Sequence, residues 1–428
     1  MTLPSLERPK IAIIGLGYVG LPLAAAFGSR FDTLGFDVSA SRVAALREGR
    51  DANGEATPED LRAEGLSFSA DPADLRGRDV FIVAVPTPID RNRQPDLGPL
   101  LAASRTVGEA LAPGGVVIFE STVYPGATED DCIPVVEARS GLTLNRDFHA
   151  GYSPERINPG DHDRPITRIV KVTSGSSPEA ADFVDALYAS VITAGTFKAA
   201  SIRVAEAAKV IENTQRDVNI ALVNELSMVF SMMGIDTNDV IDAASTKWNF
   251  MRMTPGLVGG HCIGVDPYYL MHRSMSAGYI PDIIRRAREI NESMARHAAE
   301  RLVKAMIARG ARVRGAQVLV LGLTFKENCS DIRNTKVVEL IRALESYGMR
   351  VSVHDPVADP HEARAACGVD LMTDLPEAVG LFDAVLLAVP HRSLLAIGAE
   401  GLRAHLHEDG VLFDMKAALH RGQSDLRL

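Results

Sequence analysis

Short apolar runs separated by helical stretches define the N-terminal part of the chain. A β-branched run at residues 10–14 precedes a glycine-rich turn and an Ala/Leu-rich stretch that extends to Phe27. Three more short runs follow, at Thr33–Asp37, Asp79–Pro86 and Gly115–Glu120. Uninterrupted apolar runs of this length are typical of strands buried on both faces of a parallel sheet. The pattern therefore predicts alternating strands and helices in a doubly wound α/β fold.

The same alternation returns near the C-terminus. Residues 317–326 and 351–355 are predicted strands, with an amphipathic stretch at 337–347 between them. A later run, Asp383–Pro390, repeats the residue pattern of Asp79–Pro86 almost position for position. We therefore predict a second doubly wound, Rossmann-like domain.

The segment between these regions is predicted to be mainly helical. Residues 199–233 are rich in Ala, Val and Ile, and residues 281–309 are long, charged and free of Pro and Gly after Pro281. The predicted architecture is α/β, with doubly wound domains at residues 1–198 and 311–428 joined by a helical connector at residues 199–310.

Five polar residues in the first helical segment fall on one stripe. At about 100° per residue they share an arc of about 80°, and they are Glu206, Lys209, Asn213, Asp217 and Asn224. One interpretation is an ordinary solvent-exposed face. We favour a pocket lining, because the stripe contains short amides rather than a lysine-rich run and because the other faces of the helix are apolar.

The first turn carries the Gly-x-Gly-x-x-Gly motif of dinucleotide-binding folds. Gly15 permits the tight turn, Gly17 lets backbone N–H groups approach a pyrophosphate, and Gly20 lets helix and strand pack closely. Tyr18 and Val19 lie within the motif, and the helix that follows would present its positive N-terminal end to the anion. A purely structural glycine turn is the alternative, but a strand, a helix and an acidic residue all accompany the motif here.

An acidic residue and two strand ends extend the predicted cofactor site. Asp37 lies 17 residues after Gly20, where such folds place the acid that binds the adenosine ribose. Its carboxylate would repel a 2′-phosphate, which favours NAD over NADP, although Arg42 nearby weakens this preference. Polar groups also follow two later strands, at the edge where open α/β sheets bind ligands. They are Thr87 and Thr122, and Pro86, which precedes Thr87, is a further predicted contact to the cofactor. The C-terminal domain lacks the three-glycine turn, so we expect it to bind something other than NAD.

Composition and charge narrow the class of partner. The 428 residues are 46% hydrophobic and 23% charged, close to the average of a globular protein. The formal net charge of −10 argues against a nucleic-acid partner, since the overall field would repel a phosphate backbone. No run approaches the ~18 apolar residues of a membrane span, and the N-terminus does not resemble a signal peptide. The four cysteines are far apart, which argues against a metal site and against a disulfide framework. We therefore expect a soluble cytoplasmic protein with no metal and no membrane partner.

The most unusual segment is a glycine-flanked cysteine. Gly259, Gly260 and Gly264 surround Cys262, so the backbone can bend sharply and present the thiol to a substrate. A nucleophilic thiol is useful in an NAD-dependent oxidation when an aldehyde must proceed to an acid, since a thiohemiacetal can give up a second hydride and leave a thioester for water to cleave. A packed structural thiol is the alternative. His261 adjoins the cysteine, and we expect it to have a role in the turn or at the surface rather than to form a Cys–His dyad.

Taken together, these motifs resemble those of the UDP-glucose/GDP-mannose (nucleotide-sugar 6-) dehydrogenase family from Lys10 to Lys416. Besides the glycine motif, the resemblance rests on Val85–Pro88, Glu120–Gly126, Ser153–Glu155, Glu206–Asn213 with Asn224–Glu225, Gly259–Asp266 and Leu321–Lys326. Two segments, Tyr152–Gly160 and the cysteine loop, look like the branch of the family that acts on UDP-N-acetylhexosamines.

The resemblance implies a set of catalytic residues, which are Cys262, Lys209, Asp266, Glu155, Thr122 and Asn213. Cys262 would be the nucleophile, while Lys209 and Asp266 would orient or deprotonate the C6 hydroxyl through water and stabilise the developing oxyanion. Glu155 would activate the water that hydrolyses the thioester. Thr122 and Asn213 would position water and sugar.

Substrate contacts are implied in the same way, for Glu155, Arg156, Lys209, Asn213, Arg252, Gly259, Lys326 and Arg333. The chain as a whole is negatively charged, so Lys326 and Arg333 would supply the local positive charge that binds the nucleotide. The assignment of Arg252 rests on less, because residues 245–256 do not align well with the better-known UDP-glucose enzymes.

What the family implies for the whole molecule is an NAD-binding N-terminal domain, a UDP-sugar-binding C-terminal domain and a homodimer formed through the helical middle. The implied reaction is a four-electron oxidation at C6 of a UDP-N-acetylhexosamine, UDP-N-acetylglucosamine first, to a uronate used in polysaccharide biosynthesis. UDP-N-acetylgalactosamine, UDP-glucose and UDP-N-acetylmannosamine are alternative substrates.

Two functions outside this reaction stay open at this point. A single-hydride β-hydroxyacid dehydrogenase shares the N-terminal domain, the helices and a catalytic Lys, but it needs neither a second doubly wound domain nor Cys262. A catalytically silent sugar-nucleotide-binding protein is the other, and the intact set of implied catalytic residues argues against it.

Overall fold

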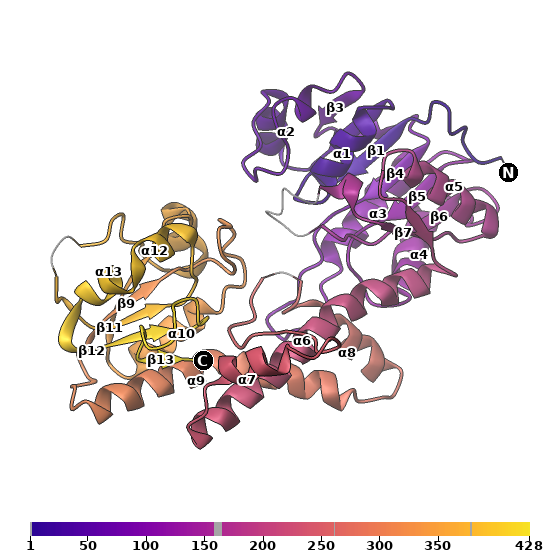
Figure 1. Cartoon of the computed structure of the whole chain (residues 1–428). Coiled ribbons are helices and arrows are strands. Elements are labelled where there is room, and N and C mark those ends of the chain that lie inside the picture. Colours follow the sequence, from indigo (N-terminus) through magenta and orange to yellow (C-terminus); the bar gives the residue numbers. More distant parts are fainter. Residues whose placement is uncertain (1, 158–164, 261, 377–378) are drawn as a thin grey trace. The chain divides into compact units, whose positions relative to one another are not determined.

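The structure is a computed structural model that describes residues 2–157, 165–260, 262–376 and 379–428 (Figure 1). The chain divides into two compact units, one made of residues 1–212 and 268–279 and the other of residues 213–267 and 280–428. Two helices, α6 (Ile202–Met233) and α8 (Asp266–Ser276), cross the boundaries between these stretches. Within the described residues, each unit is built on one large parallel sheet.

The N-terminal unit contains six parallel strands in the order β3-β2-β1-β4-β5-β6, which is the strand order of dinucleotide-binding folds. The sheet and its connecting helices are β1 (Ile11–Ile14), α1 (Gly20–Gly28), β2 (Thr33–Phe36), α2 (Ala40–Arg47), β3 (Leu66–Ser69), β4 (Val80–Val83), α3 (Gly98–Ala110), β5 (Val116–Phe119), α4 (Ile133–Ser140) and β6 (His149–Tyr152). A two-stranded sheet and a helix follow, comprising β7 (Lys171–Thr173), α5 (Pro178–Ala189) and β8 (Thr196–Lys198).

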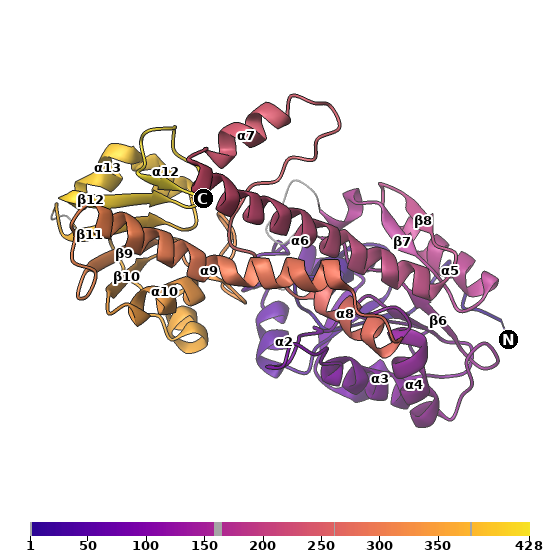
Figure 2. The same cartoon turned by 90° about the horizontal axis from the view of Figure 1, so that it is seen from below.

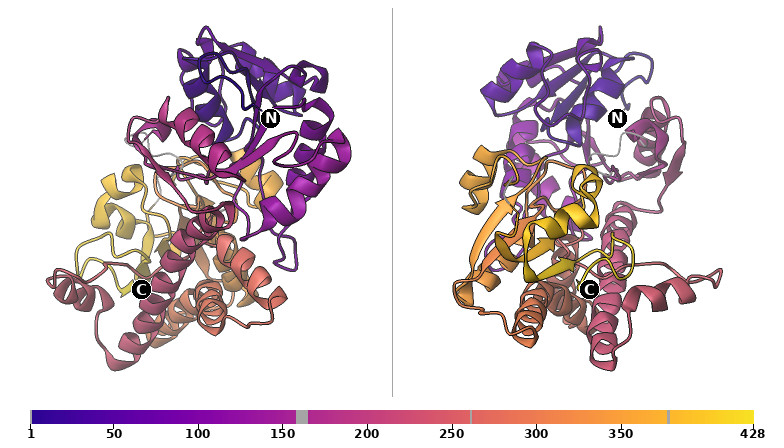
Figure 3. Two further views of the ribbon diagram at one scale, coloured as in Figure 1. Left: turned by 90° about the vertical axis from the view of Figure 1, so that its right-hand side faces the viewer. Right: turned by 60° about the vertical axis from the view of Figure 1, so that its left-hand side comes forward.

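The apolar runs of this sheet are buried on both faces. Every residue of β1, β4 and β5 is buried, which explains why these strands do not alternate in polarity. Helices α1 and α5 cover one face, where the rings of Phe27 and Tyr188 meet edge to face with centroids 5.7 Å apart. Helix α3 contacts β4 and packs against α4. Neither helix contributes to the apolar core under α1 and α5, so α3 and α4 lie on the opposite face of the sheet (Figure 3).

The C-terminal unit carries five parallel strands in the order β10-β9-β11-β12-β13, the other common doubly wound order. Its elements are β9 (Gln317–Leu321), α10 (Val337–Ser346), β10 (Arg350–His354), α11 (Pro360–Glu362), β11 (Phe382–Leu387), α12 (Arg392–Ala396), α13 (Gly398–Ala404), β12 (Leu406–Asp414) and β13 (Leu426–Arg427). Helices α9 (Asp282–Ala308) and α10 bury one face of the sheet, and α12 and α13 bury the other.

Long helices occupy the middle of the sequence. In the C-terminal unit α6 and α9 run side by side (Figure 2), joined by side-chain contacts between Asp217 and Arg288 and between Asn224 and Asn291. The short helix α7 (Thr237–Ala244) begins where the carboxylate of Asp236 accepts hydrogen bonds from the N–H groups of the first turn. Among the described helices, none is both long enough and apolar enough to cross a lipid bilayer.

The predicted fold class is confirmed. The apolar runs expected to be strands correspond to β1, β2, β4 and β5 in one sheet and to β9, β10 and β11 in the other. The two predicted helical stretches correspond to α6 and α9.

Candidate functional site

The glycine turn after β1 has the geometry that a dinucleotide requires. Gly15 has a φ of +93°, and a Cβ placed on it would lie 2.9 Å from the carbonyl oxygen of Ala84. A Cβ on Gly20 would overlap the carbonyl oxygen of Gly15, so the first turn of α1 can approach β1 only without a side chain. A Cβ on Gly17, in contrast, would meet nothing within 4 Å. The backbone at Gly17 is therefore open to a ligand, beside the N-terminus of α1, whose first turn holds no acidic residue.

The predicted ribose-binding carboxylate lies against this turn. Asp37 Oδ2 accepts the N–H of Leu16 at 2.9 Å, and Oδ1 accepts the N–H of Ser39 at 2.9 Å. The guanidinium of Arg42 donates to the carbonyl of Leu16 at 3.2 and 3.0 Å and pairs with Asp51 at 2.7 Å. Asp37 and Arg42 thus hold the N–H and the carbonyl of the same residue, Leu16. Tyr18, which follows the open glycine, is half-buried, and Val19 is the residue that caps α1.

The ends of β4 and β5 are tied together at the same edge of the sheet. Thr87 Oγ1 donates to the carbonyl of Thr122 at 2.7 Å, and Ser121 Oγ donates to the carbonyl of Val85 at 2.6 Å. Pro86 between them is exposed, and Thr122 is half-buried. Since β4 is the neighbour of β1, the structure brings these strand ends and the glycine turn to the point where the strand order reverses.

Two buried carboxylates follow β5 and β6, Glu120 after the first strand and Glu155 after the second. Glu155 is 4% exposed, its Oε1 accepts the N–H of Ile157, and its Oε2 has no hydrogen-bond partner within the described residues. Arg156 donates to the carbonyl of Val170 at 2.9 Å and pairs with Glu212 of α6 at 2.7 Å. The rest of the segment through Gly160 falls outside the described residues from position 158 on.

Sequence reasoning missed the ion pair of Glu120. Lys171 Nζ lies 2.8 Å from Glu120 Oε2, and the hydroxyl of Tyr188 donates to the other carboxylate oxygen. Burial raises the pKa of Glu120; Lys171 opposes the shift and the charge of Glu155 adds to it. The available signal was an acid directly after an apolar strand, but its partner lies 51 positions away along the chain.

All five residues of the polar stripe on α6 are buried, with exposed fractions of 6% for Lys209 and 0% for the other four. The interpretation as a solvent-exposed face is therefore wrong. The stripe is also not one continuous pocket lining. Glu206 accepts the N–H groups of Gly126 and Thr128 at 2.5 and 2.9 Å, and burial raises its pKa to about 7. Asp217 and Asn224 contact α9, as described above.

Two residues of the stripe remain as candidates for chemistry. Lys209 and Asn213 lie one turn apart on α6. Asn213 Nδ2 donates to the carboxylate of Asp266, and its Oδ1 accepts from Arg216. The structure thus brings together Asn213 and Asp266, which are 53 positions apart.

The cysteine loop ends in the first turn of α8. The carbonyl of Cys262 accepts the N–H groups of Val265 and Asp266 at 3.0 and 2.9 Å, and its side chain is half-buried. Cys262 therefore lies just before the N-terminus of α8, and the N-terminus of a helix stabilises a thiolate placed against it. A Cβ on Gly259 would lie 2.8 Å from the carbonyl oxygen of Asn334, so this backbone approach needs a glycine. His261 lies outside the described residues.

The remaining predicted substrate residues are in loops of the C-terminal unit. Lys326 is half-buried after β9, and Arg333 pairs with Asp331 at 2.5 Å in the same loop. Arg252 pairs with Asp242 of α7 at 2.6 Å and is half exposed. Within the described ranges, no three His, Cys, Asp or Glu side chains are arranged to hold a metal ion.

The sequence matches the UDP-glucose/GDP-mannose dehydrogenase family in three consecutive segments. They are the NAD binding domain at residues 9–192, the central domain at residues 203–293 and the UDP binding domain at residues 319–421. The chain belongs to this family. The predicted family is confirmed, and so is NAD as the cofactor. A single-hydride β-hydroxyacid dehydrogenase would leave the match to the UDP binding domain unexplained.

Relatives within the family match the whole chain. It is 54% identical over 420 residues to the UDP-N-acetyl-D-glucosamine 6-dehydrogenase of Pseudomonas aeruginosa, covering 98% of this chain and 99% of that protein. It is 50% identical over 424 residues to the UDP-N-acetyl-D-glucosamine 6-dehydrogenase of Salmonella typhi, covering 99% of each. The solved structure of the UDP-D-ManNAc dehydrogenase of Pyrococcus horikoshii has a TM-score of 0.87 and 30% identity, covering 98% of each chain.

Proposed function

We propose that this dehydrogenase oxidises C6 of a UDP-N-acetylhexosamine, UDP-N-acetylglucosamine first, to the uronate. The observation that carries the proposal is the half-buried Cys262 in the turn before α8, in a chain whose full-length relatives carry the name of that activity. A thiol so placed supports the second oxidation, from aldehyde to acid, which an ordinary alcohol dehydrogenase does not perform. The three-domain family match supports one domain for each nucleotide.

The glycine turn and the strand ends beside it are the residues proposed to hold NAD. The open backbone at Gly17 and the N-terminus of α1 suit a pyrophosphate. When bound, NAD accepts the hydride that leaves C6 in each of the two oxidations. The proposed contacts are Gly15, Gly17, Tyr18, Val19, Gly20, Asp37, Arg42, Pro86, Thr87 and Thr122.

In the proposed mechanism, Lys209 and Asp266 act on the first oxidation. Asp266 takes up the proton of the C6 hydroxyl through water, while the ammonium of Lys209 orients that hydroxyl and stabilises the oxyanion that develops. The product of this step is an aldehyde. The hydrogen bond from Asn213 to the carboxylate of Asp266 supports this assignment, because it fixes the orientation of the carboxylate.

Cys262 and Glu155 act on the later steps. The thiolate of Cys262 adds to the aldehyde carbon, and the new C–S bond gives a thiohemiacetal. The second oxidation leaves C6 as a thioester. Glu155 then takes a proton from a water molecule positioned with Thr122; the water oxygen attacks C6, the C–S bond breaks and the thiolate is restored. The buried Glu155 Oε2, which has no partner within the described residues, supports a role in binding water.

The proposed division of labour follows the three parts of the chain. Residues 1–198 bind NAD, residues 199–310 carry the catalytic cysteine and the dimer contact, and residues 311–428 bind the UDP-sugar. Contacts to the substrate, beyond the catalytic residues, are proposed for Arg156, Arg252, Gly259, Lys326 and Arg333. We also propose a cytoplasmic location, where the Cys262 thiol is kept reduced; cell fractionation would test it.

A homodimer through α6 is supported by the side of that helix opposite the polar stripe. Exposed apolar side chains share an arc of about 40° at 3.6 residues per turn, and they are Val204, Ile211, Leu222, Val229 and Met233. An exposed apolar stripe of this length is typical of a protein interface. Sedimentation of the wild type and of Leu222→Asp tests it: a dimer that becomes a monomer is expected, and a monomeric wild type would contradict it.

The reaction is tested by counting NADH per sugar across UDP-N-acetylglucosamine, UDP-N-acetylgalactosamine, UDP-N-acetylmannosamine and UDP-glucose. We expect two NADH per sugar, since each of the two oxidations reduces one NAD. A ratio of one NADH per sugar would contradict the proposal. Cys262→Ala should lower the rate of uronate release by about 10³-fold or more. Cys367→Ala, which removes another half-buried thiol, is the matched control and should keep full activity.

The role of Glu155 has its own test. In Glu155→Gln the hydrolytic step should slow, so that a thioester accumulates on Cys262 and adds the mass of the oxidised sugar nucleotide to the protein. Intact-protein mass spectrometry detects this adduct. Absence of the adduct together with slow turnover would assign Glu155 to a different step.

A further inference from the structure

The backbone of the cysteine loop is held on one side by a single buried amide. Asn224 Oδ1 accepts the N–H of Gly256 at 2.8 Å, and Asn224 Nδ2 donates to the carbonyl of the same residue at 3.1 Å. Both residues are buried. The side chain thus pairs with Gly256 as a neighbouring strand would, six positions before Cys262.

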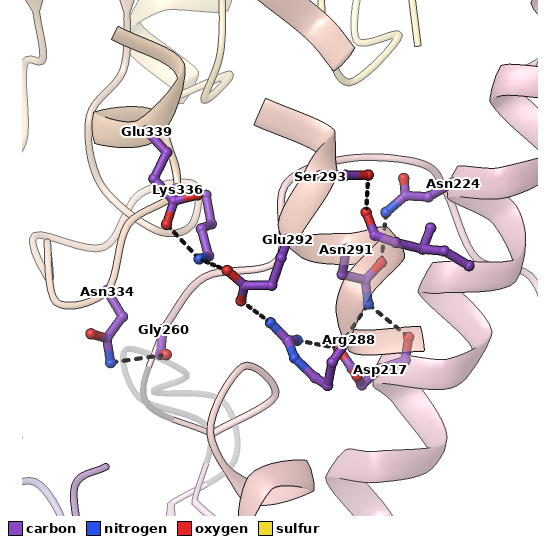
Figure 4. A network of polar contacts seen from close by, with 11 residues as sticks. Asp217, Asn224, Gly260, Arg288, Asn291, Glu292, Ser293, Asn334, Lys336 and Glu339 are labelled. Carbon is purple, nitrogen blue, oxygen red and sulfur yellow. Dashed lines mark hydrogen bonds and ion pairs between the residues drawn. The ribbon is translucent and has the colours of Figure 1, made fainter. Parts of the chain in front are cut away.

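Asn224 is itself fixed by α9. Its second Nδ2 hydrogen is donated to Asn291 Oδ1 at 2.8 Å, and Asn291 Nδ2 donates to the carbonyl and to Oδ1 of Asp217 at 2.9 and 2.7 Å (Figure 4). Every N–H of the two amides is therefore used, which sets the orientation of both side chains. The amide of Asn224 can face Gly256 in only one way.

A chain of alternating charges continues from Asp217 toward the surface. Arg288 donates to Asp217 at 2.6 Å and pairs with Glu292; Lys336 lies 2.5 Å from Glu292 and 2.6 Å from Glu339. Exposure of the side chains rises along the chain, from 0% for Asp217 and 2% for Arg288 to 44% for Glu339. Buried ion pairs add little net stability compared with apolar packing. Their presence points to a role in fixing a geometry.

The outer end of this chain reaches the other side of the cysteine loop. Lys336 follows Asn334 by two positions, and the carbonyl oxygen of Asn334 lies against Gly259, as described above. Asn334 Nδ2 also donates a long bond of 3.4 Å to the carbonyl of Gly260. The loop is thus contacted at Gly256 from α6 and at Gly259 from the segment before α10. Figure 4 shows the further contact between Asn334 and Gly260.

We propose that Asn224 and Asn334 are positioning residues that hold the cysteine loop in register for the thiol chemistry, and that the Asp217–Arg288–Glu292–Lys336 chain keeps the two contacts at a fixed spacing. The inference rests on the proposed role of Cys262. It predicts variants that bind NAD normally but in which the Cys262 thiol is displaced from the position it needs to attack the aldehyde.

Asn224→Ala tests the inner contact. Deuterium exchange of the backbone at Met253–Gly260 should become faster by about tenfold, because the Gly256 N–H loses its acceptor. A displacement of the thiol by about 1 Å lowers kcat by about 10²-fold, while the KM for NAD should change by less than twofold. A general loss of structure would raise exchange everywhere and would not separate kcat from KM in this way.

Asn334→Gly tests the outer contact. Asn334 has a φ of +53°, so glycine keeps its backbone while the side chain is removed. This variant should also lower kcat at unchanged KM for NAD. It decides the question if Asn224→Ala fails to fold. Glu339→Gln removes only the exposed end of the charge chain and is the matched control, with kcat and exchange equal to those of the wild type.

The proposal is overturned if kcat and exchange at Met253–Gly260 stay within twofold of the wild type in both asparagine variants. It is also overturned if Glu339→Gln lowers kcat as much as they do. A wild type that oxidises no sugar nucleotide would instead refute the proposed function, and the exchange measurement, which needs no substrate, would still report whether Asn224 holds the loop.

Discussion

The two doubly wound sheets begin with the same turn and then diverge. Gly15 and Gly322 have φ values of +93° and +91°, and their N–H groups bond the last carbonyl of the neighbouring strand at 2.8 and 2.9 Å. In each unit a carboxylate after that strand accepts the N–H of the leucine that follows the glycine. Asp37 does so in the N-terminal unit and Asp355 in the C-terminal unit.

The difference lies in what comes after the leucine. In the N-terminal unit it is Gly17, exposed and with open space where a side chain would stand. In the C-terminal unit it is Thr324, fully buried, with its Oγ1 3.2 Å from His391 Nε2. His391 is also fully buried and lies 3.1 Å from Asp355. In the first turn Asp37 accepts the N–H of Leu16 and the space beside Gly17 is open. In the second turn Asp355 accepts the N–H groups of both Leu323 and Thr324, and the buried threonine side chain takes the place that is open at Gly17. The first turn is therefore better suited to a dinucleotide than the second.

The largest effect on stability should come from adding a side chain at Gly322, in the turn after β9. In Gly322→Ala, the new Cβ would lie 2.5 Å from Val389 Cβ, at a φ that alanine rarely adopts. We expect a loss of about 3 kcal/mol in the free energy of unfolding, with an unchanged dissociation constant for NAD. Urea unfolding and NAD titration of the same preparation would check both, and weaker NAD binding would show that the two turns are coupled.

A smaller, pH-dependent effect is expected at Asp355. Burial alone would raise its pKa, but the hydrogen bonds from His391 and from the N–H groups of Leu323 and Val357 hold the pKa well below its usual value. A carboxyl group with a lowered pKa stabilises the fold above its unfolded pKa of about 3.9, and this stabilisation is lost as the pH falls below that value.

Asp355→Asn should therefore be less stable than the wild type by about 2 kcal/mol at neutral pH. The difference should stay nearly constant down to about pH 4 and shrink as the pH falls further. Thermal unfolding of both proteins between pH 7 and about pH 2.5 measures it. A difference that grows on acidification would mean that the pKa of Asp355 is raised.

The smallest effect should be the most selective. Gly17→Ala adds a methyl group that touches nothing in the protein, so the unfolding temperature should stay as in the wild type. The dissociation constant for NAD should rise about tenfold, or about 1.4 kcal/mol, because the methyl group stands where the pyrophosphate approaches. Calorimetric titration with NAD would decide it, and unchanged affinity would mean that the dinucleotide lies elsewhere.

The parts of the fold that could be predicted are those with a local cause. β1, β4 and β5 are buried on both faces and therefore appear as uninterrupted apolar runs. β3 and β6 were missed, because Leu66–Ser69 mixes serine with apolar residues and His149–Tyr152 contains histidine and glycine. Only pairing with β2 and β5, which the sequence pattern does not contain, makes strands of them.

The candidate site divides in the same way. The glycine motif and the glycine-flanked Cys262 are local and could be recognised from spacing. The contacts that orient them join residues far apart in sequence, such as Glu120 with Lys171, Asn224 with Gly256 and Asp355 with His391. The polar stripe on α6 shows the limit most clearly: periodicity placed its five members on one side, but only the fold shows that three of them serve internal networks.

On α6 the polar stripe is buried and the apolar stripe is exposed, the reverse of an ordinary surface helix. This arrangement affects any redesign of the protein. Common stabilising strategies place leucine at buried helix positions and remove apolar side chains from exposed ones. On α6 the first strategy would choose Asp217, and Asp217→Leu would take from Arg288 its innermost counter-ion; removing one partner of a buried pair costs about 3–5 kcal/mol. A design procedure that ranks the positions of α6 by burial and hydropathy alone would predict that Asp217→Leu stabilises the protein, whereas the substitution would lower its free energy of unfolding.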